Sequence, residues 1–348
     1  MVEITSKAGS RSQTESASPL CDKPPGNPLV RSRIRRRTLS LALIALAPLS
    51  CTLLSFPGRL DPQGDVPIAP PATLNVTPAP PSAADTLALL AVTEPPHRDR
   101  IGLAARFLGI AEAPLLRAGQ ADYQVGDVET LWAEDSLTDE VFQVSAELVY
   151  QTPHVYMWVE EGVAVDEEKL AASAEHFENE TYPTTRRYFG EEPSPGVDGD
   201  AHLHILHTPK IGYQVAGYFY SPSQFPASVV PYSNEREMFY INPFNTPPGE
   251  GYYDAVLAHE FQHMIQWNLD RNEETWLDEG LAELSAYLNG FGPSSFAPSY
   301  MAHPDTQLTD WPEIDFGRQP FYGGSFLFMA YFLSRFGESA LYDLAHNP

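Results

Sequence analysis

The residues best suited to chemistry are His259, Glu260 and His263, which stand together as His-Glu-Phe-Gln-His. Apolar residues recur at helical spacing from Tyr253 to Trp267, so these residues are predicted to lie on an α-helix. Residues four apart share one helix face, and both imidazoles can therefore bind a single metal ion. Glu260 would then project towards the open coordination position, where a carboxylate can act as a base.

A carboxylate that can complete the metal site follows at Glu279, in the segment WLDEGLAE. This segment starts a second helix with periodic apolar residues, and the connection is long enough for that helix to pack against the first. Two histidines and a glutamate are a known ligand set of catalytic zinc. Glu283 lies one turn further on, where it can accept the other ring N–H of a ligating histidine. Alternatively, Asp278, Glu279 and Glu283 form a solvated acidic helix start, which the helix dipole favours.

HEFQH followed by WLDEGLAE resembles the gluzincin branch of the zinc metallopeptidases, in clan MA, whose third ligand is the Glu of a WLNEG-like segment. The likeness is greatest to the hyicolysin type, and the M1 aminopeptidases share the WLNEG element. The resemblance implies zinc binding by His259, His263 and Glu279, with Glu260 as general base. The segment before Glu279 is shorter than in those aminopeptidases, and no GAMEN-like motif precedes HEFQH. Exopeptidase activity is therefore not favoured.

A second likeness lies in PFYGGS, at 320–325, ahead of the apolar segment 326–336. It resembles the tyrosine-containing turn of gluzincins. That comparison implies that Tyr322 donates its phenolic O–H to the oxyanion of the tetrahedral intermediate. The residues alone leave an alternative, in which Tyr322 is an aromatic side chain that packs at a helix start. Gly337 is expected to end that helix, because a glycine accepts the left-handed conformation.

Together these groups predict a zinc-dependent peptidase that cleaves within chains. Zinc activates water in such enzymes, and Glu260 is expected to be the general base that removes its proton. One alternative is an exopeptidase in which Glu235 or Glu237 binds the free amine of the substrate. Another is a catalytically silent module of the same fold that serves as a surface binding domain. The presence of Glu260 favours the enzyme, because a pure binder does not need a base.

These residues must be positioned by helices and strands, and the pattern of both along the sequence predicts an α+β fold. Five stretches have the composition and alternation of strands, and Asp166 is expected to cap a helix between the second and the third. The strands are predicted at 142–150, 155–160, 202–207, 216–220 and 238–241. The resemblance implies a zincin-like fold, with a mixed sheet, an active-site helix and a mainly helical C-terminal subdomain. It also implies that the strand at 216–220 binds an extended peptide by main-chain pairing.

Four regions are expected along the chain. Residues 1–56 form a basic leader and a signal or anchor segment, because an arginine-rich stretch precedes an apolar one. Residues 57–96 are a proline-rich linker, and residues 97–122 hold a short helical segment. Residues 123–348 form the catalytic domain, whose C-terminus reads as truncated. The leader predicts secretion or tethering at a bacterial surface, either by the anchor itself or by a lipidated Cys51.

The net charge limits the kinds of binding partner that are expected, and the cysteine content limits the possible disulfides. The chain has 46 Asp and Glu against 21 Lys and Arg, a formal net charge of −25. Such a surface repels phosphate backbones, so a protein or peptide substrate is expected and nucleic acid is not. Calcium is possible, but Asp198 and Asp200 in GVDGD are more typical of a turn. Only Cys21 and Cys51 occur, so the predicted catalytic domain has no disulfide.

Three histidines close together, His202, His204 and His207, also raise the possibility of a metal site. The first two alternate onto one face of the predicted strand. No carboxylate is spaced to complete the set, so a structural role is favoured for them.

Overall fold

The structure, a computed structural model, describes residues 83–92, 99–110, 122–312 and 317–347. The predicted leader at 1–56, Cys51 and most of the predicted linker at 57–96 lie outside these residues. Within them, no helix is both long enough and apolar enough to cross a membrane. The described chain mixes α-helices with one six-stranded sheet, as the sequence predicted for an α+β protein.

The sheet has the strand order β1-β2-β3-β4-β6-β5. The first three strands pair antiparallel, β3, β4 and β6 pair parallel, and β5 returns antiparallel to β6 at the edge. The strands are β1 (Val128–Asp135), β2 (Glu140–Gln151), β3 (Val155–Glu160), β4 (Leu203–His207), β5 (Gly217–Phe219) and β6 (Met238–Ile241). All five predicted strands are present. The sheet also contains β1, which was not predicted because charged residues lie near both of its ends.

The central strands are buried on both faces, which suits the parallel part of a sheet. Their alternate residues enter two separate cores. Met157, Ile205 and Phe239 pack on the side of the helices, in a core that includes Phe261. Trp158 and its neighbours in register pack on the other side, against β1 and β2.

Two helices precede the central helix and cover the first of these cores. Helix α3 (Glu167–His176) begins at Asp166, whose carboxylate accepts a hydrogen bond from the Lys169 N–H at 3.2 Å, as the capping prediction required. A π-helical turn, Phe177–Thr181, leads directly into α4 (Tyr182–Phe189). Helix α5 (Gly251–Leu269) then runs beside the sheet and is buried around most of its circumference. A helix that is apolar on all sides is typical of the interior of a domain.

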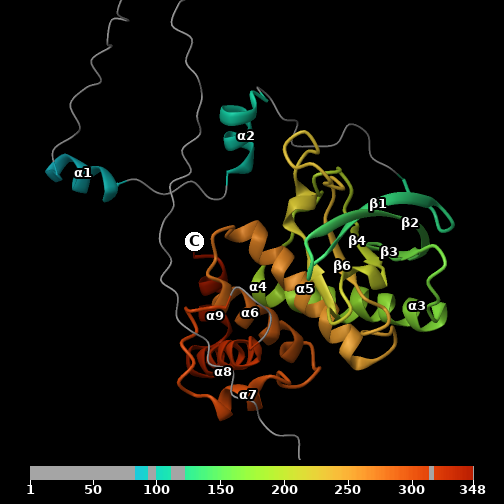
Figure 1. The fold of residues 1–348 in the computed structure, drawn as a ribbon. Helices are drawn as coiled ribbons and strands as arrows, with labels where there is room; N and C mark the ends of the chain where they lie inside the picture. The colour runs from blue at the N-terminus through green and yellow to red at the C-terminus, as the bar shows by residue number, and fades with distance from the viewer. Residues whose placement is uncertain (1–82, 93–98, 111–121, 313–316, 348) are drawn as a thin grey trace, which may run out of the picture. The chain divides into compact units, whose positions relative to one another are not determined.

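The C-terminal part is helical, as predicted. Helices α6 (Thr275–Leu288), α7 (Ala297–Ala302), α8 (Gln319–Phe336) and α9 (Glu338–Ala345) gather on the side of α5 away from the sheet (Figure 1). Gly337 ends α8 with a φ of 85°, in the region that favours glycine. Helix α5 thus separates a sheet layer from a helical layer, and α6 packs directly against it.

The N-terminal helices differ from the prediction in one respect. Helix α1 (Ala83–Leu90) lies inside the range predicted as a proline-rich linker, because a run of alanine and leucine without proline interrupts that range. Helix α2 (Arg100–Leu108) falls in the predicted helical segment and ends at Gly109 with a φ of 69°. Its buried Ala104 packs against Phe225 and Trp267 in a small third core.

Candidate metal centre

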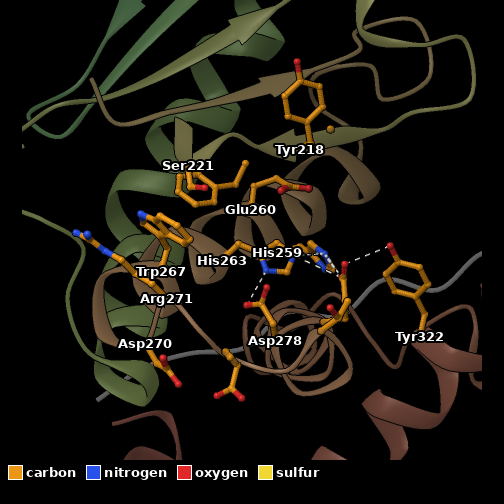
Figure 2. A pocket seen from close by; sticks show the side chains of 15 residues that line it. Tyr218, Ser221, His259, Glu260, His263, Trp267, Asp270, Arg271, Asp278 and Tyr322 are labelled. Carbon is orange, nitrogen blue, oxygen red and sulfur yellow. Dashed lines mark hydrogen bonds and ion pairs between the residues drawn. The ribbon is translucent and has the colours of Figure 1, made fainter. Parts of the chain in front are cut away.

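Helices α5 and α6 bring His259, His263 and Glu279 to one point (Figure 2). The two Nε2 atoms are 3.1 Å apart. Both face the Oε2 atom of Glu279, from 3.3 Å for His259 and 3.5 Å for His263. Among the described residues, this is the one group of three or more potential ligands that could hold a metal ion. Two imidazole nitrogens and one carboxylate oxygen are a donor set that suits Zn²⁺.

The local sequence explains why α6 can approach so closely. Only residues 270–274 connect the two helices, and the Ser285 hydroxyl donates a hydrogen bond to the Ala258 carbonyl of α5 at 2.9 Å. Gly280, next to Glu279, faces α8. A Cβ atom at Gly280 would lie 2.9 Å from Cγ of Met329 and 3.0 Å from the carbonyl oxygen of Ser325, so α8 would have to shift to make room for it. The glycine of WLDEG therefore lets α6 pack against α8 while Glu279 points at α5.

The outer ring nitrogen of each histidine also faces a carboxylate. Asp278 Oδ1 lies 3.0 Å from Nδ1 of His263, whereas Glu283 Oε1 lies 3.7 Å from Nδ1 of His259. The predicted partner, Glu283, is thus beyond hydrogen-bond distance, and sequence reasoning missed the shorter contact of Asp278. A carboxylate at this nitrogen fixes the tautomer that leaves Nε2 free for a metal ion.

These contacts shift the pKa values of His259, His263 and Glu279. Burial alone would lower the pKa of His263, but the carboxylates of Asp278 and Glu279 outweigh it and hold that pKa well above its ordinary value. Burial would raise the pKa of Glu279, yet the charge of His263 and hydrogen bonds from both histidines hold it well below its usual range. The pKa of His259 is also raised, because a hydrogen bond to Glu279 overcomes the effect of burial. The carboxylate of Glu279 is therefore ionised at neutral pH.

Glu260 occupies the space between α5 and the edge strand. Its side chain is among the buried charged residues, and its carboxylate accepts a hydrogen bond from the Phe219 N–H of β5. Burial raises the pKa of Glu260, and the neighbouring histidines oppose that rise. A carboxylate with a raised pKa beside a metal cluster is suited to accepting and returning a proton.

Tyr322 reaches the cluster from the opposite helical layer. Its hydroxyl donates a hydrogen bond to Glu279 Oε1 at 3.3 Å, and its ring packs against Phe296 and Trp311. The residue lies in the first turns of α8 and not in a turn ahead of it, because α8 starts at Gln319. Burial raises the pKa of Tyr322 well above its ordinary value, so the hydroxyl keeps its proton. The ring contacts agree with the packing interpretation, and the role of Tyr322 as a donor to an oxyanion stays a prediction.

Two cavities adjoin the cluster and share His259, Glu260 and Tyr322 as lining residues. One, of about 360 Å³, extends along the C-terminal part of α5. The other, of about 700 Å³, extends along the N-terminal part of α5, where Tyr252 and Val256 line it. Tyr218 of β5 lines both cavities. A chain that follows the edge strand would pass from one cavity to the other across His259, His263 and Glu279.

The remaining sequence candidates lie elsewhere. His204 accepts a hydrogen bond from the Trp158 indole at 3.0 Å. His207 bonds to the Trp158 carbonyl and the Tyr253 hydroxyl, each at 2.8 Å. Burial lowers the pKa of both histidines to about 4, so they are neutral structural groups. His202 contacts the carboxylate of Asp200 at 2.5 Å.

The acidic candidates also have local roles. The carboxylate of Asp198 accepts a hydrogen bond from the Asp200 N–H, as in a turn. Glu237 is buried and accepts from the Val197 N–H, while Glu235 accepts from the Ala227 N–H. Neither Glu235 nor Glu237 lines either of the two cavities at the cluster.

Comparison with known proteins does not add to this picture, since the chain matches no family model and no curated protein. The geometry of the site is therefore the basis for inferring the function of the protein.

Replacing Asp278 by alanine tests the role of the contact with His263. We expect the affinity for Zn²⁺ to fall about 10- to 100-fold, because the ligand loses the group that orients its ring. Competition with a chromophoric chelator measures this affinity. Glu274→Ala removes an exposed carboxylate of the same segment and should leave the affinity unchanged. Equal affinities of Asp278→Ala and the wild type would show that Asp278 does not position the ligand.

Proposed function

We propose that the protein is a zinc-dependent endopeptidase with a zincin-like fold. The observation that carries this proposal is the convergence of His259, His263 and Glu279 beneath an edge strand, with Glu260 buried beside them. The arrangement supplies three protein ligands and a base, which is the composition of a hydrolytic zinc site. It also agrees with the resemblance of HEFQH and WLDEGLAE to the gluzincins.

His259, His263 and Glu279 would hold the zinc ion. When bound, zinc acts as a Lewis acid that polarises a carbonyl group and lowers the pKa of water. The carboxylate of Glu260 takes the proton of the attacking water and returns it to the leaving amine. The Tyr322 hydroxyl, which stays protonated, donates a hydrogen bond to the oxygen that gains negative charge in the transition state.

Strand β5 provides a means of holding the substrate. One of its edges pairs with β6, and its residues Gly217, Tyr218 and Phe219 line the cavity beside the cluster. A peptide can add to such an edge by main-chain hydrogen bonds, independent of its sequence. Because cavities lie on both sides of the ligands, the site can accept residues before and after the scissile bond. This favours cleavage within a chain over removal of a terminal residue.

The proposed setting is outside the cytoplasm. The arginine-rich stretch and the apolar stretch within residues 31–56 support export, with the catalytic domain secreted or tethered at the cell surface. The strongly negative net charge agrees with a protein or peptide substrate and disfavours nucleic acid.

Glu260→Gln should separate metal binding from catalysis. The amide keeps the shape of the side chain but cannot take a proton, so we expect kcat for a quenched fluorogenic peptide to fall about 10²- to 10⁴-fold. Zinc content, measured by atomic emission on the same samples, should stay at the wild-type level. Undiminished turnover in Glu260→Gln would rule out its role as the base.

The matched variant is Glu279→Ala, which removes a ligand and should lose both zinc and activity. If Glu279→Ala retains full zinc content, Glu279 is not a ligand. A wild-type protein that binds zinc and a peptide but cleaves none would instead be the silent binding module.

Tyr322→Phe tests the hydrogen-bond donor without removing the ring. The packing against Phe296 and Trp311 is kept, so the fold should persist. We expect kcat to fall about 10²- to 10³-fold, as for the loss of one donor to an oxyanion, with little change in KM. A variant with wild-type kcat would leave Tyr322 with a packing role alone.

A further inference from the structure

The smaller cavity at the metal cluster has an acidic lining that the reaction itself does not require. It lies where α5 ends and the connection to α6 begins, and its volume is about 360 Å³. Asp270 and Glu273 of that connection line it, together with Trp267 and Phe219. We name this space the acidic cavity. It opens onto His263 and Glu260, so a side chain of a bound peptide can enter it.

Neither of these two carboxylates is held in an ion pair with a described residue. In the described part of the chain, Asp270 and Glu273 form no ion pair with a lysine, arginine or histidine. Asp270 accepts a hydrogen bond from the Asn272 N–H at 2.8 Å, and Glu273 accepts one from the Gln266 side chain at 3.2 Å. Burial, together with the charge of Asp270, raises the pKa of Glu273 to about 7. A cation in the cavity would relieve this cost by stabilising the ionised form.

The wall of the acidic cavity also carries one cation of the chain itself, Arg271, which is among the lining residues. The guanidinium of Arg271 lies 5.5 Å from the ring centre of Trp267 and 5.9 Å from that of Phe225. Because aromatic faces attract cations at such distances, Arg271 is held by these two rings and not by an ion pair with Asp270 or Glu273. In Figure 2, Arg271 projects away from the histidines, beyond Trp267, so it does not fill the space next to the ligands. The C-terminal end of α5 adds the negative end of a helix dipole.

The direction of β5 decides which part of a substrate meets this cavity. Phe219 and Ser221, at the C-terminal end of β5, line the acidic cavity, whereas Gln214 and Val215 line the larger one. A peptide that pairs antiparallel with β5 places its N-terminal residues at the C-terminal end of the strand. Antiparallel pairs are the more stable kind, and β5 already pairs antiparallel with β6.

We propose that the acidic cavity binds a lysine or arginine side chain on the N-terminal side of the scissile bond. The inference rests on the proposed peptidase function and names the class of substrate that the site prefers. Asp270 and Glu273 act as specificity-determining residues that recognise the cation, while the walls of the cavity contact its alkyl stem.

Four quenched peptides that differ only at one residue test this preference. The variable position holds arginine, lysine, leucine or glutamate, is followed by phenylalanine, and is flanked by alanines. For the zinc-loaded wild type, we expect kcat/KM to be about tenfold higher with arginine or lysine than with leucine, and lowest with glutamate. Mass spectrometry of the products should place the cation immediately before the cleaved bond.

The double variant Asp270→Asn, Glu273→Gln should lower kcat/KM for the arginine peptide about tenfold and leave the leucine peptide unchanged. Activity on leucine also verifies that the variant is folded and holds zinc. Glu274→Gln is the matched control, because Glu274 is exposed and does not line the cavity. It should keep the wild-type preference.

Three results would overturn the inference. The double variant could keep the preference for arginine, or the wild type could cleave all four peptides equally. The cation could also occupy the position after the cleaved bond, which would exclude the antiparallel arrangement. If the zinc-loaded wild type cleaves none of the peptides, the proposed function itself fails and this inference fails with it.

Discussion

The close packing of α6 against α5 is the constraint on which the site depends. His259 and His263 share one face of a helix by sequence alone, but Glu279 can reach them only if the second helix lies at a fixed distance and rotation. The Ser285 hydroxyl, bonded to the Ala258 carbonyl, ties the two helices on one side. Gly280 allows α8 to press on the other. A displacement of about 1 Å would be enough to spoil a constellation of this kind.

The packing of α6 against α5 also brings the charged groups of the cluster together. Buried charges are costly unless they are paired or bind a metal ion. Here the half-buried His259 and His263 face Asp278, Glu279 and Glu283, an arrangement that would suit a cation at its centre. Two further carboxylates, those of Asp270 and Glu273, line the adjoining acidic cavity and form no ion pair with a cationic side chain of the described chain. In the proposed peptidase, these carboxylates would suit peptides that carry positive charge.

The sequence could predict whatever depends on periodicity or on spacing within one element. The positions of His259 and His263 on a helix, the Asp166 cap and the five strands follow from local patterns. It could not assign the contacts of the two carboxylates beside Glu279. The rotation of α6 relative to α5 brings Asp278 to 3.0 Å from its histidine and leaves Glu283 at 3.7 Å. Glu283 was favoured because it shares a helix face with Glu279, but tertiary packing decides which carboxylate reaches a ring nitrogen.

Other differences have similar causes. Strand β1 carries charged residues near both ends and is stabilised by pairing along its whole length with residues 140–147 of β2. Tyr322 was expected in a turn because PFYGGS resembles the tyrosine-containing turn of gluzincins, yet Tyr322 and the two glycines after it lie inside α8. The glycines are needed there because a Cβ at Gly323 would overlap the carbonyl of Phe296. Such glycines reflect close packing between helices, which a single sequence does not distinguish from a turn.

X-ray absorption at the zinc edge, on protein purified with its native metal, tests the central claim most directly. The account predicts one zinc ion per chain with two imidazole nitrogens at about 2.0–2.1 Å and the remaining ligands oxygen. It also predicts that the histidine signature disappears in a variant with both His259 and His263 replaced by alanine. A spectrum with sulfur at about 2.3 Å, or with oxygen ligands alone, would contradict the proposed centre.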